Sequence, residues 1–140
     1  MLFDDSLRAH LAATRTIAVI GAKDKPGQPV DAVGRYLIEA GYEVLPVHPV
    51  RKCVWGLETY PSLADITVAI DLVDVFRAPE HCPRHAAEVL ALPHKPRLFW
   101  MQLGIRSPEA GRLLAGQGIA VVEDLCLMVE HRRLFGGGIR

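Results

Sequence analysis

The residues that most directly suggest chemistry form a loop near the start of the chain. The loop Gly21–Pro26, with the sequence GAKDKP, follows the apolar run Ile17–Ile20 and precedes an amphipathic stretch. Glycine permits a turn that a side chain would obstruct, and the helix that follows directs free N–H groups towards the loop. Lys23 and Lys25 add two positive charges. The pattern predicts a phosphate-binding site, and the alternative is a solvated loop with incidental lysines.

The loop does not carry the full dinucleotide-binding pattern of three glycines, because the second glycine of G-x-G-x-x-G is replaced by Lys23. The next apolar run, Glu43–Val47, leads into His48 and then into Arg51 and Lys52. No Asp or Glu stands there to bind both ribose hydroxyls, as an NAD site requires. A basic rim suits a ribose that carries a phosphate, which favours NADP or coenzyme A. A simple turn role for His48 is the alternative.

Two further apolar runs end in residues that suit a ligand. Phe76 and Arg77 follow the third run, and this pair can stack on an adenine or line a thioester channel, while the guanidinium can also bind phosphate. The alternative is that Phe76 belongs to the core and Arg77 is a surface charge. Gln102 follows the fourth run, where it either bonds a ligand amide or caps neighbouring backbone.

The elements that must position these residues alternate in type. Five short, nearly continuous apolar runs predict strands buried on both faces: Ile17–Ile20, Glu43–Val47, Ile70–Phe76, Leu98–Met101 and Ile119–Val122. Five other stretches predict helices: Phe3–Ala13, Asp31–Ala40, Glu80–Leu92, Pro108–Gly116 and Asp124–Leu134. The alternation predicts one α/β domain, a Rossmann-like doubly wound parallel sheet of about five strands with helices on both faces. The domain spans residues 1–135, and residues 136–140 are predicted to be a flexible tail.

Such sheets bind ligands beyond the carboxyl ends of their strands, so the residues described above should converge at one edge. The segment Lys52–Ile66 fits neither pattern and predicts a crossover, in which Ser62 caps a short helical turn. Gly34 is predicted to allow close packing of a helix on a strand. Trp55 and Trp100 are predicted to be packing residues.

Composition indicates which partners and which cellular compartment to expect for the protein. The 140 residues carry 16 basic and 16 acidic side chains, and this balance argues against nucleic-acid and membrane-surface partners. The three cysteines form no CxxC pair, which favours a reducing compartment. The chain has neither a signal-peptide pattern nor an apolar stretch of the ~20 residues needed to span a bilayer. We therefore expect a cytoplasmic protein.

The chain resembles a known family in five blocks that follow the family's order. The blocks are IAVIGAKDKPGQPVDAVGRYLIEAGYEVLPVHP, VWGLETYPSLADI, IDLVDVFRAPE, LFWMQLG and EDLCLMVEHRRL, and they extend from about Thr16 to Leu134. They resemble the small stand-alone CoA-binding proteins. That family shares its fold with the N-terminal domain of the succinyl-CoA synthetase alpha subunit and of ADP-forming acyl-CoA synthetases.

The resemblance implies that the Gly21–Pro26 loop holds the phosphates of coenzyme A or an acyl-CoA. The turn at His48 would border the adenosine end, Phe76 and Arg77 would flank the adenine or the pantetheine arm, and Gln102 would close the crevice. The candidate binding residues are Gly21, Ala22, Lys23, Lys25, Pro26, Val47, His48, Pro49, Phe76, Arg77 and Gln102. The chain departs from the family at His48, where asparagine is common. It also lacks an arginine that the family tends to carry near Gln28–Asp31, where an acid at Asp31 could weaken binding.

No self-contained catalytic or metal site is evident. His81 and His85 could share a helical face, but no further zinc ligand lies nearby, so exposed residues at a helix start are the simpler interpretation. Cys126 and His131 face different sides of one predicted helix, which favours a buried cysteine and a surface histidine over a catalytic pair. The sequence thus favours a binding protein over an enzyme. The alternatives are an NADP-dependent oxidoreductase and a synthetase subunit that depends on an ATP-grasp partner, and a homodimer is a further expectation.

Overall fold

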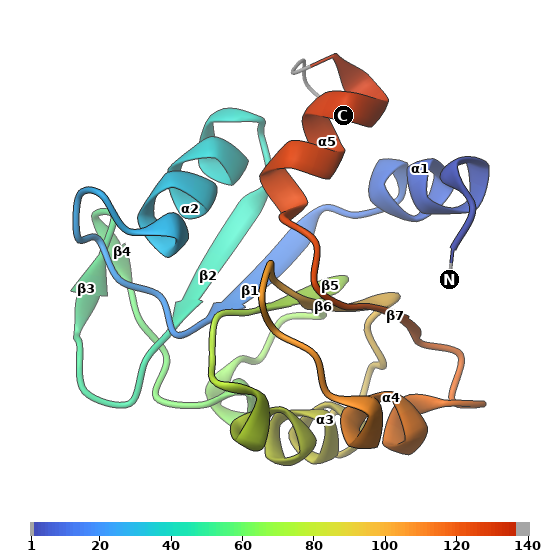
Figure 1. Ribbon diagram of the computed structural model, residues 1–140. Coiled ribbons are helices and arrows are strands. Elements are labelled where there is room, and N and C mark those ends of the chain that lie inside the picture. The colour runs from blue at the N-terminus through green and yellow to red at the C-terminus, as the bar shows by residue number, and fades with distance from the viewer. Residues whose placement is uncertain (1, 137–140) are drawn as a thin grey trace.

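Five parallel strands form the centre of the computed structural model, which describes residues 2–136 (Figure 1). The strands are β1 Thr16–Ile20, β2 Glu43–Val47, β5 Leu72–Val75, β6 Leu98–Met101 and β7 Ala120–Val122. Their order in the sheet is β2-β1-β5-β6-β7, and each neighbouring pair is parallel. Each predicted apolar run overlaps one of these strands, so the prediction of the sheet is confirmed.

Helices cover both faces of the sheet. The helices α1 Asp4–Ala12, α2 Pro29–Glu39 and α5 Leu127–Phe135 lie on one face, and α3 Cys82–Leu90 and α4 Pro108–Leu114 lie on the other (Figure 1). Side chains of a strand alternate between the faces. Ile17 and Val19 accordingly pack under α1, α2 and α5, whereas Ala18 and Ile20 pack under α3 and α4. The doubly wound Rossmann-like fold predicted from the alternation is confirmed.

Helix boundaries follow local capping signals. The Ser107 side chain caps α4 by accepting a hydrogen bond from the Ala110 N–H at 3.1 Å. The helix α5 starts three residues later than predicted because Asp124 has a left-handed backbone with φ 59° and its carboxylate binds the Gly104 N–H at 2.7 Å. Gly136 ends α5 in a left-handed conformation, so the first residue of the predicted tail is a helix cap. The rest of that predicted tail, residues 137–140, lies outside the described residues.

The predicted crossover contains a small hairpin and a helical turn. The strands β3 Cys53–Val54 and β4 Leu57–Glu58 pair antiparallel, and the two-residue turn between them has φ of 55° and 74°. The 3-10 turn η1 Leu63–Asp65 follows, and Ser62 caps it as predicted. A second 3-10 turn, η2 Pro79–His81, leads into α3. Within residues 2–136, no helix is both long and apolar enough to span a lipid bilayer.

The prediction that Gly34 brings α2 close to a strand was wrong, because Gly34 faces the Trp55 indole. A Cβ at this position would lie 2.1 Å from two atoms of that ring. The indole is half-buried, and its Nε1 donates a hydrogen bond to Asp31 Oδ1 at 2.9 Å. Trp55 thus fixes the crossover hairpin against α2. Trp100 is fully buried, which confirms its packing role.

Candidate ligand-binding site

The chain changes direction within the sheet between β1 and β5. From β1 it proceeds to β2 on one side, and it later re-enters at β5 on the other side of β1. Ligands of such sheets bind outside the carboxyl ends of the strands at this switch point. Two cavities of about 410 Å³ and 270 Å³ lie there, and Gly21 and Arg77 line both of them. We call them the larger and the smaller cavity.

The larger cavity lies on the side of α2 and α5. Its walls are mostly apolar, with Lys23, Gln28, Arg77 and Gln102 as polar groups, and Cys126 lies in its wall. The smaller cavity is lined by Val47 at the end of β2, by Pro49 just after it, by Leu63 of η1 and by side chains of α3. A continuous ligand would therefore pass between the two cavities beside Gly21 and Arg77.

The structure brings together most, but not all, of the predicted residues. The larger cavity is lined by Gly21, Lys23, Phe76, Arg77 and Gln102, and the smaller one by Gly21, Val47, Pro49 and Arg77. Ala22, Lys25, Pro26 and His48 line neither cavity. Ala22 is buried, Lys25 and Pro26 are exposed on the loop beside the larger cavity, and His48 is half-buried. Phe76 packs against the core as well as lining the cavity.

Gly21 is required by the protein's own backbone. Its φ is +83°, and a Cβ there would lie 2.3 Å from the carbonyl oxygen of Phe76. The N–H groups of Gly21 and Ala22 both donate to the Val47 carbonyl oxygen, at 3.0 and 3.3 Å. These two amides join β1 to β2, so their N–H groups already have an acceptor within the protein. The side chains of Lys23 and Arg77 and the amino end of α2 line the larger cavity and could act as donors for an anion.

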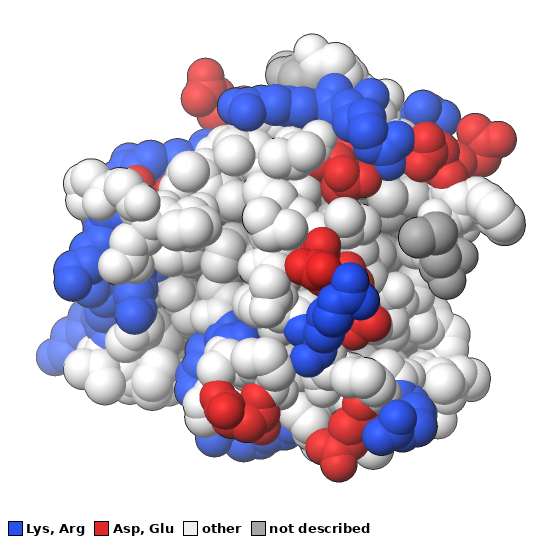
Figure 2. All heavy atoms as spheres, in the orientation of Figure 1, with Lys and Arg blue, Asp and Glu red and all other residues white. Residues whose placement is uncertain are grey.

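Positive charge gathers around the cavities. Figure 2 shows Lys and Arg side chains concentrated on the side of the molecule where the loops after β1 and β2 lie. The Arg51 guanidinium is held by Asp24 Oδ1 at 3.2 Å, and Asp24 Oδ2 accepts the Trp55 N–H at 3.3 Å. Asp24 was not predicted, and it connects the first loop to the second. Asp31 does not oppose an anion as a free charge, because Arg35 Nε lies 3.0 Å from its Oδ1.

His48 organises the turn after β2. Its Nδ1 accepts the N–H groups of Val50 and Arg51 at 3.1 and 3.0 Å, which bears out the turn role considered for it. An asparagine Oδ1 accepts backbone N–H groups in the same way, so His48 reproduces a common asparagine turn. Burial, then the positive charges of Arg51, Lys23 and Arg77, lower the pKa of His48.

Comparison with known proteins now identifies the family. A family model described as a CoA binding domain matches residues 15–132. This chain belongs to the CoA-binding domain family. The uncharacterized protein YneT of Bacillus subtilis (strain 168) is 36% identical over 125 residues, which cover 89% of this chain and 91% of YneT. The family indicates coenzyme A as the ligand.

Two solved structures are closely similar to this CoA-binding domain. The Thermus thermophilus protein described as cell-free ID.343 is 48% identical, with a TM-score of 0.89 and coverage of 96% of this chain and all of that one. A hypothetical protein from Pyrococcus horikoshii OT3 is 33% identical, with a TM-score of 0.91 and coverage of 96% of this chain and 94% of that one. The similarity extends across the sheet and both helical layers.

Gln102 of the CoA-binding domain has a partner that the sequence did not indicate. Its Nε2 donates to Asp74 Oδ1 at 2.7 Å, and both residues are buried. Neither alternative considered for Gln102, a ligand amide or a backbone cap, describes this contact. Burial raises the pKa of Asp74 to about 7 against the opposing effect of the Gln102 hydrogen bond. A signal existed, because Asp74 is the charged residue in an otherwise apolar strand.

Several expectations about other reactive residues need correction. His131 is fully buried instead of lying at the surface, and its Nδ1 lies 2.6 Å from the Tyr36 hydroxyl. His85 is buried rather than exposed, with Nδ1 2.6 Å from Glu88 Oε1, and His81 is half-buried. Cys126 is only half-buried and borders the larger cavity. In the described part of the chain, no three His, Cys, Asp or Glu side chains are grouped so as to hold a metal ion.

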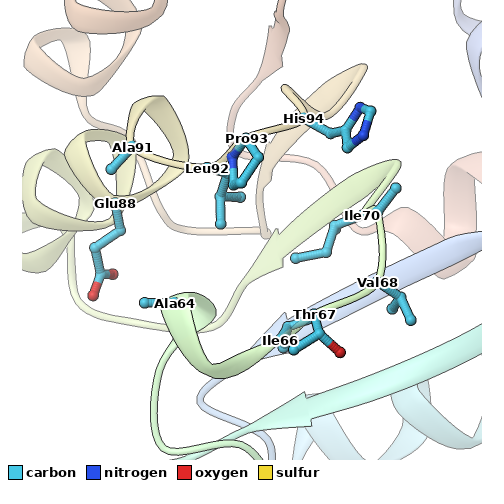
Figure 3. Close-up of a pocket in the computed structure, with 11 residues that line it drawn as sticks. Ala64, Ile66, Thr67, Val68, Ile70, Glu88, Ala91, Leu92, Pro93 and His94 are labelled. Carbon is cyan, nitrogen blue, oxygen red and sulfur yellow. The ribbon is translucent and has the colours of Figure 1, made fainter.

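A further cavity of about 380 Å³ lies beside α3 (Figure 3), and it has Glu88 in common with the wall of the smaller cavity. Its walls come from the segment that precedes β5, including Ile66 and Ile70, and from the turn after α3, including Leu92. Glu88 and His94 lie on opposite sides of it in Figure 3. It opens near the amino end of β5, so it faces away from the edge where parallel sheets bind nucleotides.

Proposed function

We propose that this protein binds coenzyme A or an acyl-CoA across the larger and smaller cavities and acts as a binding protein without a reaction of its own. The observation that carries the proposal is that Gly21 and Arg77 form a wall common to both cavities. Coenzyme A has an adenine at one end, phosphates in the middle and an apolar arm at the other end. Two partly apolar cavities that meet at the positively charged Arg77 suit that order of groups. We call the region around Arg77 and the neighbouring Lys23 the basic junction.

The adenosine end is proposed to lie against Val47 and Pro49 in the smaller cavity. The diphosphate then passes Arg77 and reaches Lys23 and the amino end of α2, where the helix dipole favours an anion. The arm continues along Phe76 and Gln102 in the larger cavity. Among the predicted residues that line neither cavity, Lys25 contributes charge, whereas Ala22, Pro26 and His48 shape the loops.

Isothermal titration calorimetry tests the ligand class. We expect coenzyme A and acetyl-CoA to bind and NADPH not to bind, because the cavities suit a long arm and not a nicotinamide riboside. Binding of NADPH without coenzyme A would favour the oxidoreductase alternative and contradict the proposal.

Charge reversal tests the basic junction. The double variant Lys23→Glu/Lys25→Glu is expected to weaken coenzyme A binding by about 1–3 kcal/mol, which is the scale of hydrogen bonds to charged groups. The matched control is Arg97→Glu/Arg112→Glu, which reverses two exposed charges outside both cavity walls. Equal effects of the two double variants would show that net charge, and not the loop, determines affinity.

Partners remain part of the proposal. A stable homodimer would suit a stand-alone binding protein, whereas copurification with an ATP-grasp protein would indicate a synthetase subunit that receives catalysis from its partner. Native mass spectrometry of the protein purified from its host distinguishes these assemblies and also detects retained coenzyme A.

A further inference from the structure

The larger cavity has a buried carboxyl group behind its wall. Asp74 lies in the middle of the sheet, paired in register with Val19 of β1 and Trp100 of β6, and none of its surface is exposed. Its Oδ1 accepts the hydrogen bond from Gln102, whereas its Oδ2 has no hydrogen-bond partner among residues 2–136. A buried acidic group with one neutral partner is costly for a sheet that could hold an apolar residue there. That cost indicates a role beyond packing.

The contact fixes the orientation of the Gln102 amide. The NH₂ end of Gln102 faces Asp74 Oδ1, and this is the orientation that the ionised carboxyl requires, because a carboxylate can only accept hydrogen bonds. The carbonyl Oε1 is then the end that remains for other partners, and within the described chain it makes no hydrogen bond. Gln102 lines the larger cavity, so this oxygen is the group that a ligand there would meet.

We infer that Asp74 is a positioning residue that turns Gln102 Oε1 towards the larger cavity, where it accepts a hydrogen bond from an amide N–H of the pantetheine arm. This inference rests on the proposed function, because it places the arm of coenzyme A in the larger cavity. The arm carries two amide N–H donors. An acceptor that is already held in place binds such a donor more tightly than a freely rotating amide does, because it loses less conformational freedom on binding. Asp74 itself does not line the cavity and acts through Gln102.

The test compares two ligands that differ only in the arm. Coenzyme A and 3′-phosphoadenosine 5′-diphosphate are titrated at pH 8, where Asp74 is ionised, into the wild type, Gln102→Met, Asp74→Val and the double variant. One lost hydrogen bond should weaken coenzyme A binding about 3- to 10-fold in each single variant. The double variant should be no weaker than Gln102→Met, because both changes remove one contact. The nucleotide without the arm should bind all four proteins equally.

The conservative variant Asp74→Asn separates positioning from general stability. The asparagine oxygen can still accept the hydrogen bond from the Gln102 NH₂ group. The reversed pairing, in which Gln102 Oε1 accepts from the asparagine, is also possible, and dividing the protein between two pairings lowers coenzyme A affinity by at most about a factor of two. We therefore expect Asp74→Asn to bind coenzyme A within about twofold of the wild type. Thermal unfolding of every variant confirms that the titrated protein is folded.

Three outcomes overturn the inference. They are unchanged coenzyme A affinity in Gln102→Met, equal weakening of both ligands, and additive losses in the double variant. If the wild type binds the armless nucleotide but not coenzyme A, both the inference and the proposed ligand are wrong, and only the nucleotide site remains. If the wild type binds neither ligand, the proposed function itself is wrong.

Discussion

Replacing Asp74 by asparagine should change how the stability of the protein depends on pH. Burial raises the pKa of Asp74 to about 7 in the folded protein, from a value of 3.8 without that environment. Between these two values the folded state holds a proton that the unfolded state has lost. Stability must therefore fall as pH rises through this window, and the loss is complete above the folded pKa.

The size of the effect follows from the same two values. A shift of about three units corresponds to about 4 kcal/mol at 1.36 kcal/mol per unit. Part of this change already occurs below pH 5, so we expect about 3 kcal/mol between pH 5 and pH 8. Asparagine cannot ionise and retains an oxygen for the Gln102 hydrogen bond. The free energy of unfolding of Asp74→Asn, relative to that of the wild type, should therefore increase by about 3 kcal/mol between pH 5 and pH 8.

Urea unfolding at pH 5, 6, 7 and 8 measures this difference directly, and melting temperatures should diverge by roughly 10 °C over the same range. The control is Asp5→Asn, which removes a fully exposed carboxylate on α1 and should leave the pH dependence of stability as in the wild type. If the stability curves of Asp74→Asn and the wild type stay parallel from pH 5 to pH 8, Asp74 does not titrate in this window. The account of its burial would then be refuted.

Substitutions at His48, Gly21 and Gly34, with Gly111 as a control, test the loops and the α2 surface. His48→Ala should lose about 1–2 kcal/mol of stability in urea unfolding at pH 8, because two backbone N–H groups lose their acceptor. His48→Asn should lose less than half of that, and equal losses would contradict the turn role. Gly21→Ala should cost at least about 2 kcal/mol, since it combines strain at positive φ with a clash against backbone, and a native-like melting temperature would contradict this. Gly34→Ala should displace the Trp55 indole and shift tryptophan fluorescence, whereas Gly111→Ala meets open space and should be neutral or stabilising by up to about 1 kcal/mol.

The strands were predictable because strands buried on both faces are apolar at nearly every position. The run Leu98–Met101, for example, is entirely buried and contains no polar side chain. Helix ends such as Ser107 were also predictable, since capping depends on residues within one turn. The start of α5 was not, because it depends on the contact between Asp124 and the distant Gly104.

The site was predictable at the level of strand ends and not at the level of hydrogen bonds. Lys23, Phe76, Arg77 and Gln102 meet at the larger cavity because parallel strands end at one edge. The engagement of the Gly21 amide by Val47 depends on strand register, which a single sequence does not specify. The role of Gly34 depends on an indole that arrives from a hairpin 21 positions further along, at Trp55.

The turn at His48 connects the chemistry of the ligand to that of the protein. Its Nδ1 accepts two N–H groups only when it carries no proton, and its pKa is lowered first by burial and then by the positive charges of Arg51, Lys23 and Arg77. The turn's contribution to stability is therefore full above about pH 6.5, the ordinary histidine value, and is lost as pH falls below it through the lowered pKa. Lys23 and Arg77 line the cavities in which the diphosphate is proposed to lie, so a bound anion would offset part of their effect on the ring. The positive charges of Lys23 and Arg77 thus help burial to keep the His48 turn in its hydrogen-bonded form, and they also supply the charge that an anionic ligand needs.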